Sequence, residues 1–210
     1  MGAFVNFLSF LIFTAVLPDT EYYVYEANDK GKISEIKVSV KRDTAGYRVR
    51  YVLHDRTVDI IVDTAELSTI YVEKIVKGKW EVTVKLNDAF INNYKGRITA
   101  YHETKPVYDR HTLDLALRGF KYKADYINRI RLNVPEFMII NADISVIGSD
   151  KVSTPVSDFD CWKILMIPRV IFTKIKFYFW IEKEYPHRFI KYSDSTGKNQ
   201  LLLKEYSRKP

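Results

Sequence analysis

The dominant pattern along this chain is strict alternation of apolar and polar residues, which places successive side chains on opposite faces of a β-strand. It is most regular over residues 80–86, where every second residue from Trp80 onward is apolar. The same alternation recurs in residues 36–41, 47–53, 58–62 and 138–146. Strands of this kind bury one face and leave the other in water, which is typical of antiparallel sheets.

Short glycine-containing turns separate these segments. They lie at residues 28–31, 43–46, 77–79, 94–96 and 195–197. Short connections join antiparallel neighbours, and glycine supplies the positive φ that tight hairpins need. The first half therefore predicts a meander, and further strands are expected at residues 160–167, 176–181, 188–192 and 199–206. Because residues 177–180 are aromatic on both faces, we expect both faces of that strand to be covered.

The alternation stops between Pro106 and Pro135, where apolar residues recur at helical spacing. These residues are Leu113, Ala116, Leu117 and Phe120. Either Asp109 or Thr112 fits the N-cap, and Gly119 fits the end of the helix. The sequence thus predicts one short helix within a mainly β protein.

The first 17 residues hold no charged side chain, and their apolar stretch is typical of a secretory leader. It is short for a membrane span, which needs roughly 20 apolar residues. We interpret residues 1–19 as a signal or leader segment and residues 20–210 as a single domain. An uncleaved anchor or a buried segment is the alternative. No lipid-attachment motif is present, because the single cysteine is Cys161 and position six is Asn6. An exported, periplasmic location follows from this interpretation.

Composition supports a folded domain: 47% of residues are hydrophobic, with 15 Tyr and 12 Phe, which excludes disorder. One cysteine excludes an intramolecular disulfide framework, so we expect Cys161 to be a small buried apolar residue. The net charge of +7 comes from basic residues scattered singly along strands, which is typical of a solvated face. This distribution predicts no nucleic-acid binding and leaves peripheral contact with an anionic membrane surface open.

Catalytic and metal-binding patterns are weak. The four histidines, His54, His102, His111 and His187, lack the paired spacing of zinc sites, so no metal is expected. His111 and Asp114 are three residues apart, and we expect a hydrogen bond on the helix surface there. No phosphate-binding loop or nucleophile elbow occurs, so the sequence predicts neither an enzyme nor a cofactor. A pocket that joins His102 or His111 to Asp160 would favour an enzyme instead.

The order of elements resembles a known family. After the leader and the long meander, residues 109–120 form the predicted helix, and the closing part contains Phe177–Ile181, Pro186 and a last strand after Gly197. Over residues 20–206 this resembles the bacterial domain-of-unknown-function family 3108, whose members are exported proteins with a Trp-containing strand and a closing hairpin. That family is similar in expected fold to the periplasmic lipoprotein carriers.

The resemblance implies a mainly β fold, in which a single antiparallel meander curves into an incomplete barrel with one or two helices plugging its concave side. It places three residues on the plug and four on the inner wall as candidate ligand-binding residues. They are Leu113, Leu117 and Phe120 on the plug, and Trp80, Met138, Ile140 and Phe179 on the wall. The family offers no catalytic residues to carry over.

The function predicted from these features is a noncatalytic exported protein that binds a hydrophobic or amphiphilic, lipid-like ligand in a curved sheet. The alternative is an envelope scaffold or interaction protein whose barrel is filled by its own side chains and whose partner is another envelope protein.

Overall fold

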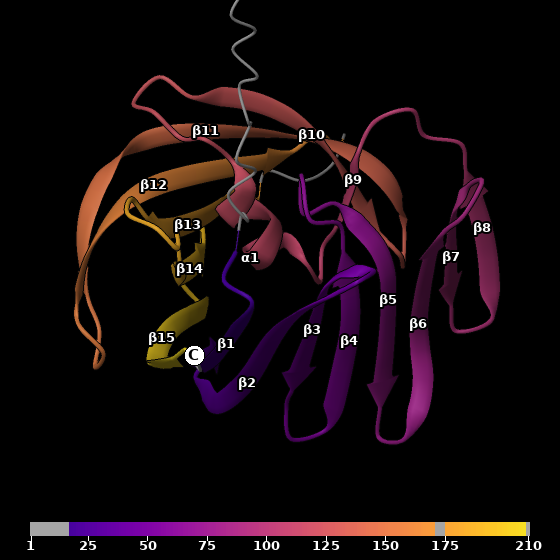
Figure 1. Ribbon diagram of the computed structural model, residues 1–210, viewed down its shortest axis with the longest axis horizontal. Coiled ribbons are helices and arrows are strands. Elements are labelled where there is room, and N and C mark those ends of the chain that lie inside the picture. Colours follow the sequence, from indigo (N-terminus) through magenta and orange to yellow (C-terminus); the bar gives the residue numbers. More distant parts are fainter. Residues whose placement is uncertain (1–16, 171–174, 209–210) are drawn as a thin grey trace, which may run out of the picture.

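The computed structural model describes residues 17–170 and 175–208, which form one fifteen-stranded sheet wrapped around a short helix (Figure 1). The sheet curves strongly but does not close into a barrel by backbone pairing. The predicted mainly β, incomplete-barrel architecture is therefore confirmed. Residues 1–16, which make up most of the predicted leader, lie outside the described part of the chain.

The strands follow the chain in two meanders. They are β1 (Thr20–Asp29), β2 (Lys32–Asp43), β3 (Gly46–Val52), β4 (Arg56–Val62), β5 (Thr69–Val76), β6 (Lys79–Leu86), β7 (Phe90–Tyr94), β8 (Arg97–Tyr101), β9 (Val107–Asp109), β10 (Ile127–Val134), β11 (Met138–Ser153), β12 (Asp158–Pro168), β13 (Phe177–Glu182), β14 (Phe189–Asp194) and β15 (Asn199–Ser207). Their order across the sheet is β8 to β1, then β15 down to β9. The first and last strands lie side by side, and every pair of neighbouring strands in the sheet is antiparallel except β9 with β10.

Hairpin turns occur where the glycines predict them. Four connections are two residues long, and three of them contain a glycine: Gly31, Gly78 and Gly96 have φ of 92°, 74° and 89°. The residue before each glycine also has positive φ, as in Lys30 at 52°. Two consecutive positive φ values match the right-handed twist of the flanking strands, so these turns bring neighbouring strands together without splaying them.

The helix is shorter than the sequence pattern suggests. α1 spans Leu113–Ala116 and continues as a 3-10 turn, η1, over Leu117–Gly119. Gly119 ends the helical segment as predicted, and Phe120 is already extended. Thr112 occupies the N-cap position, but its hydroxyl donates to the carbonyl of Asp109 and does not cap the helix. Within the described ranges, no helix has the length and apolar character needed to cross a membrane.

The plug helix is fixed to the sheet by a buried arginine. The side chain of Arg118 is 2% exposed and lies 2.9 Å from a carboxylate oxygen of Glu21 on β1. It also donates to the carbonyls of Pro186 and His187 between β13 and β14, and its guanidinium stacks over the ring of Tyr23. Because a buried charge is tolerated only when it is paired and hydrogen-bonded, these contacts hold the plug in one position.

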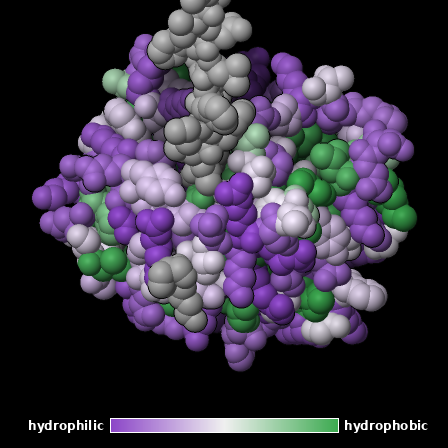
Figure 2. All heavy atoms as spheres, viewed as in Figure 1, coloured by the Kyte–Doolittle hydropathy of each residue, from purple (hydrophilic) through white to green (hydrophobic). Residues whose placement is uncertain are grey.

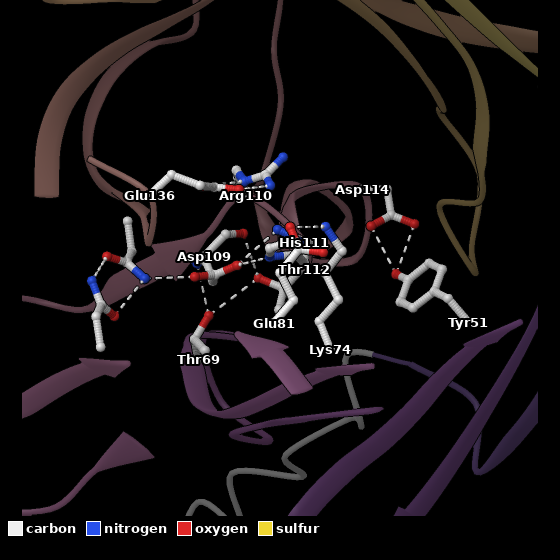
Figure 3. A network of polar contacts seen from close by, with 12 residues as sticks. Tyr51, Thr69, Lys74, Glu81, Asp109, Arg110, His111, Thr112, Asp114 and Glu136 are labelled. Atoms are coloured by element: carbon white, nitrogen blue, oxygen red, sulfur yellow. Dashed lines mark hydrogen bonds and ion pairs between the residues drawn. The ribbon is translucent and has the colours of Figure 1, made fainter. Parts of the chain in front are cut away.

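Side chains join the two ends of the sheet. Asn92 on β7 donates to Asn133 on β10 at 2.6 Å, and Asn133 donates to Asp109 at 2.6 Å. The backbone N–H of Asp109 donates to Thr69 on β5, whose hydroxyl contacts that of Thr112 (Figure 3). All five residues are buried. We call Thr69, Asn92, Asp109, Thr112 and Asn133 the polar seam.

β8 is the end of the sheet that lies beyond the seam. Its residue Ile98 is 67% exposed, and β6, which lies near the same end of the sheet, exposes Trp80 and Leu86. The space-filling view is mostly hydrophilic, with apolar atoms gathered on the side of the molecule where β5 to β8 lie (Figure 2). The interior on one side of the polar seam is therefore covered, whereas β6 and β8 on the other side expose apolar side chains.

Candidate ligand-binding cavity

A cavity of about 1130 Å³ lies on the concave side of the sheet, against the start of α1. It is larger than the roughly 300–1,000 Å³ typical of small-molecule pockets. Strands from both meanders supply its wall, because the curvature of the sheet brings β2–β4 opposite β10–β14. Among its apolar lining residues are Ile36, Val58, Leu132, Met166, Phe177 and Leu201.

The mouth of the cavity exposes apolar side chains from two connections. Phe137 and Met138, at the β10–β11 turn, are 54% and 42% exposed, and Ile175, before β13, is 47% exposed. Both connections lie at the same end of β11 and β12, where the backbone N–H of Arg169 donates to the carbonyl of Asn141 on β11. Scattered exposed apolar residues are ordinary, but here they border an apolar cavity, so a ligand that enters remains in contact with apolar surface throughout.

One carboxyl group lies on the cavity wall. Asp114 is deep in the molecule, and the hydroxyl of Tyr51 lies 2.8 and 2.9 Å from its two oxygens (Figure 3). Burial raises the pKa of Asp114 above its usual range, and the Tyr51 hydrogen bond offsets only part of that effect. The wall is therefore a surface that disfavours charge at this position.

His111 also lines the cavity. Its Nδ1 lies 2.7 Å from Asp109, and its Nε2 has no hydrogen-bond partner in the structure. The prediction of a hydrogen bond between His111 and Asp114 is wrong. His111 bonds to Asp109, and Asp114 bonds to Tyr51. The reason is that the helix starts only at Leu113, so His111 lies before it and takes a partner within the preceding turn.

Five basic side chains line the cavity, and each forms an ion pair with a carboxylate that is not part of the lining. The pairs are Arg56 with Asp55 (2.8 Å), Lys74 with Glu81 (3.6 Å), Arg110 with Glu136, Arg131 with Glu103 (2.5 Å) and Arg169 with Asp143 (2.5 Å). Each of these cations already has a carboxylate partner, although Asp143 is shared between Arg169 and Arg129, so the wall attracts anions less than its five basic side chains alone would suggest.

The structure brings four of the seven predicted site residues to the cavity: Leu113, Met138, Ile140 and Phe179. Leu117 is fully buried in the core behind it. The ring of Phe120 packs 5.6 Å from that of Tyr108, in an aromatic cluster away from the lining.

Trp80 is not on the inner wall. Its side chain is 75% exposed, although Val82 and Val84 on the same strand are buried. The register shifts between Lys74 and Ile75, where Ile75 pairs with Trp80, at the hairpin end of β5 and β6. Here the strands run past the core, so the alternation continues without anything for Trp80 to pack against.

Sequence reasoning missed the Tyr51–Asp114 pair as well as the basic side chains. The two residues are 63 positions apart, and no local pattern links them. Asp160 is exposed and does not line the cavity, so the pairing that would favour an enzyme is not formed.

Cys161 behaves as predicted. It is fully buried, and burial raises the pKa of its thiol to about 12. Among residues 17–170 and 175–208, no group of three potential metal-binding side chains comes together.

Neither a protein family nor a curated protein sequence matches the chain. Among solved structures, it is similar to a β-barrel-like protein of domain of unknown function DUF1849 from Brucella abortus. That match has 10% identity and a TM-score of 0.57, and covers 93% of this chain and 100% of that one. The chain shares the fold of bacterial β-barrel-like domains of unknown function.

Two further solved structures are similar only at TM-scores too low to indicate a shared fold. MucB matches with 9% identity and a TM-score of 0.37, covering 92% of this chain and 54% of that protein. A protein described as exported, with a YmcC-like fold, from Bacteroides fragilis matches with 12% identity and a TM-score of 0.36, covering 91% and 97%. Membership of family 3108 in particular stays a prediction.

Proposed function

We propose that this chain is a noncatalytic, exported protein that holds a hydrophobic or amphiphilic, lipid-like molecule in the cavity of its curved sheet. The observation that carries the proposal is an apolar cavity of about 1130 Å³ that the plug helix leaves unfilled. An apolar ligand covering such walls gains about 25 cal/mol for each Å² removed from water. Export is supported by the uncharged apolar leader pattern at residues 1–17.

The cavity also favours this proposal over a self-filled scaffold. Protein interiors normally pack to the density of organic crystals, with few voids larger than a water molecule. A barrel that served only as a scaffold would gain stability from larger side chains at Leu132, Ile140 or Met166, all of which line the cavity. A retained cavity with apolar walls is instead the form expected of a binding site.

Two measurements test the proposal. Native mass spectrometry of protein purified from an envelope fraction, followed by lipid extraction, should show a bound lipid-like mass. In solution, the uncharged fluorescent probe phenylnaphthylamine should bind the purified protein. Met166→Trp, which places a large ring in the cavity, should weaken probe binding by at least about tenfold, or about 1.4 kcal/mol.

Ile98→Trp is the matched control, because Ile98 is exposed on β8 and outside the lining. It should bind the probe like the wild type. If no lipid copurifies and the probe does not bind, the ligand-binding function is wrong. Crosslinking that then recovers a specific envelope protein would establish the scaffold alternative.

A further inference from the structure

The polar groups on the cavity wall indicate which kind of polar group the ligand carries. This inference depends on the proposed function. Asp114 lines the cavity, and among the ion pairs of residues 17–170 and 175–208 none includes it. Its side-chain hydrogen bond is with the hydroxyl of Tyr51. Because a tyrosine hydroxyl has one proton to donate, the carboxyl oxygens retain unused acceptor capacity.

A charged ligand group fits poorly beside Asp114. An anion would be repelled by the carboxylate, and the five basic side chains of the lining already have carboxylate partners. A cation would gain an ion pair, but it would first have to lose its hydration in an apolar chamber. The desolvation cost of a buried pair often equals or exceeds the Coulombic gain.

An uncharged hydrogen-bond donor avoids both costs. A hydroxyl group can donate to an oxygen of Asp114 while its attached chain lies against apolar wall residues such as Ile140 and Phe179. His111 also lines the cavity, but its unpartnered Nε2 is buried and offers no exposed surface to a ligand. Asp114, drawn with Tyr51 in Figure 3, is therefore the acceptor that this part of the wall offers.

We infer that the ligand is an uncharged amphiphile with a hydroxyl group, and that Asp114 is the residue that accepts its hydrogen bond. Tyr51 is then a positioning residue, because its hydroxyl orients the carboxyl group toward the cavity.

Competition against bound phenylnaphthylamine at neutral pH tests this inference. Decanol, decanoate and decylammonium share one chain length and differ only in the polar end. With the wild-type protein, decanol should displace the probe at a concentration at least about tenfold lower than either charged competitor. Asp114→Leu should bind the probe but lose that preference, and Asp114→Asn, which retains a carbonyl acceptor, should keep most of it.

Asp88→Leu is the control, because Asp88 is exposed in the β6–β7 turn and should leave all three competitors unchanged. The wild-type comparison needs no variant, so it holds even if Asp114→Leu does not fold. If the probe binds and decanoate or decylammonium competes as well as decanol, the inference is overturned while the ligand-binding function stands. If the probe does not bind to the wild-type protein, the proposed function itself fails.

Discussion

The carboxyl group of Asp114 couples the stability of this protein to pH. Burial raises the pKa of Asp114 in the folded protein above the value of 3.8 expected in the unfolded chain. Between these two pKa values the folded state binds more protons than the unfolded state. The contribution of Asp114 to stability therefore falls as pH rises through that window, and it stays low at neutral pH.

Asp114→Asn should remove this dependence. Relative to the wild type, the variant should gain stability as pH rises from the acid range to neutrality, as measured by urea denaturation at a series of pH values. Asp43→Asn provides a control of opposite sign, because the backbone N–H of Ala45 and the side chain of Arg48 lower the pKa of Asp43. That variant should lose stability relative to the wild type over the same rise in pH. Parallel curves for Asp114→Asn and the wild type would contradict the prediction.

At this scale, sequence alternation identified the inward face but not the extent of the core. Val82 and Trp80 share a face of one predicted strand, yet Val82 is 1% exposed and Trp80 is 75% exposed. Period-two patterning reports the direction of a side chain, and only the packed structure reports whether another layer covers it. The sequence gives no indication of the Tyr51–Asp114 pair, because the curvature of the sheet brings together two residues that are far apart in the chain.

Hairpins are the elements that the sequence predicts best, since a turn and its two strands are local. Each of the turns at residues 28–31, 43–46, 77–79, 94–96 and 195–197 contains a glycine with positive φ. The helix was the weaker prediction, because apolar spacing over residues 113–120 is compatible with both a full helix and the observed α and 3-10 turns.

Gly46, at the β2–β3 turn, is needed for a steric reason beyond its φ of 144°. A Cβ at this position would collide with the carbonyl oxygen of Val62, whereas one at Gly31 would meet nothing within 4 Å. Gly31→Ala should therefore cost about 1 kcal/mol for its left-handed conformation. Gly46→Ala should cost about 1 to 3 kcal/mol more, because β2–β3 must move away from β4. Urea denaturation of both variants measures the difference, and equal losses would show that the close approach is unimportant.

At the level of the whole molecule, curvature and closure were the features that periodicity could not define. The resemblance to curved-sheet proteins implied an incomplete barrel, but nothing in the sequence linked Asn92 to Asn133, or Thr69 to Asp109. These contacts join residues roughly 40 positions apart in the chain. Local pattern carries no trace of them, because a period-two repeat describes only residues within one strand.

Asn133→Leu tests the role of the polar seam. The substitution leaves the buried amide of Asn92 and one carboxylate oxygen of Asp109 without a partner. Each unsatisfied buried group costs about 1–3 kcal/mol, so we expect a loss of about 2 to 6 kcal/mol in the free energy of unfolding. Hydrogen exchange should accelerate in β7 and β8 while β1 to β3 remain protected.

Asn128→Leu is the matched control on the same strand, because Asn128 bonds to Tyr126 and takes no part in the seam. It should cost less and leave exchange in β7 and β8 unchanged. Uniform exchange along the sheet in Asn133→Leu would show that the seam does not hold the two ends together.

In a barrel closed by a continuous ladder, the diameter is set by the number of strands and the stagger of their register. In this protein the last gap is bridged by a few amides, hydroxyls and one carboxylate. Single substitutions in the polar seam can therefore change the width of the interior, because longer or shorter side chains hold the two ends of the sheet farther apart or closer together. If the proposed ligand-binding function holds, the width of the ligand that fits can therefore change while every hairpin stays as it is.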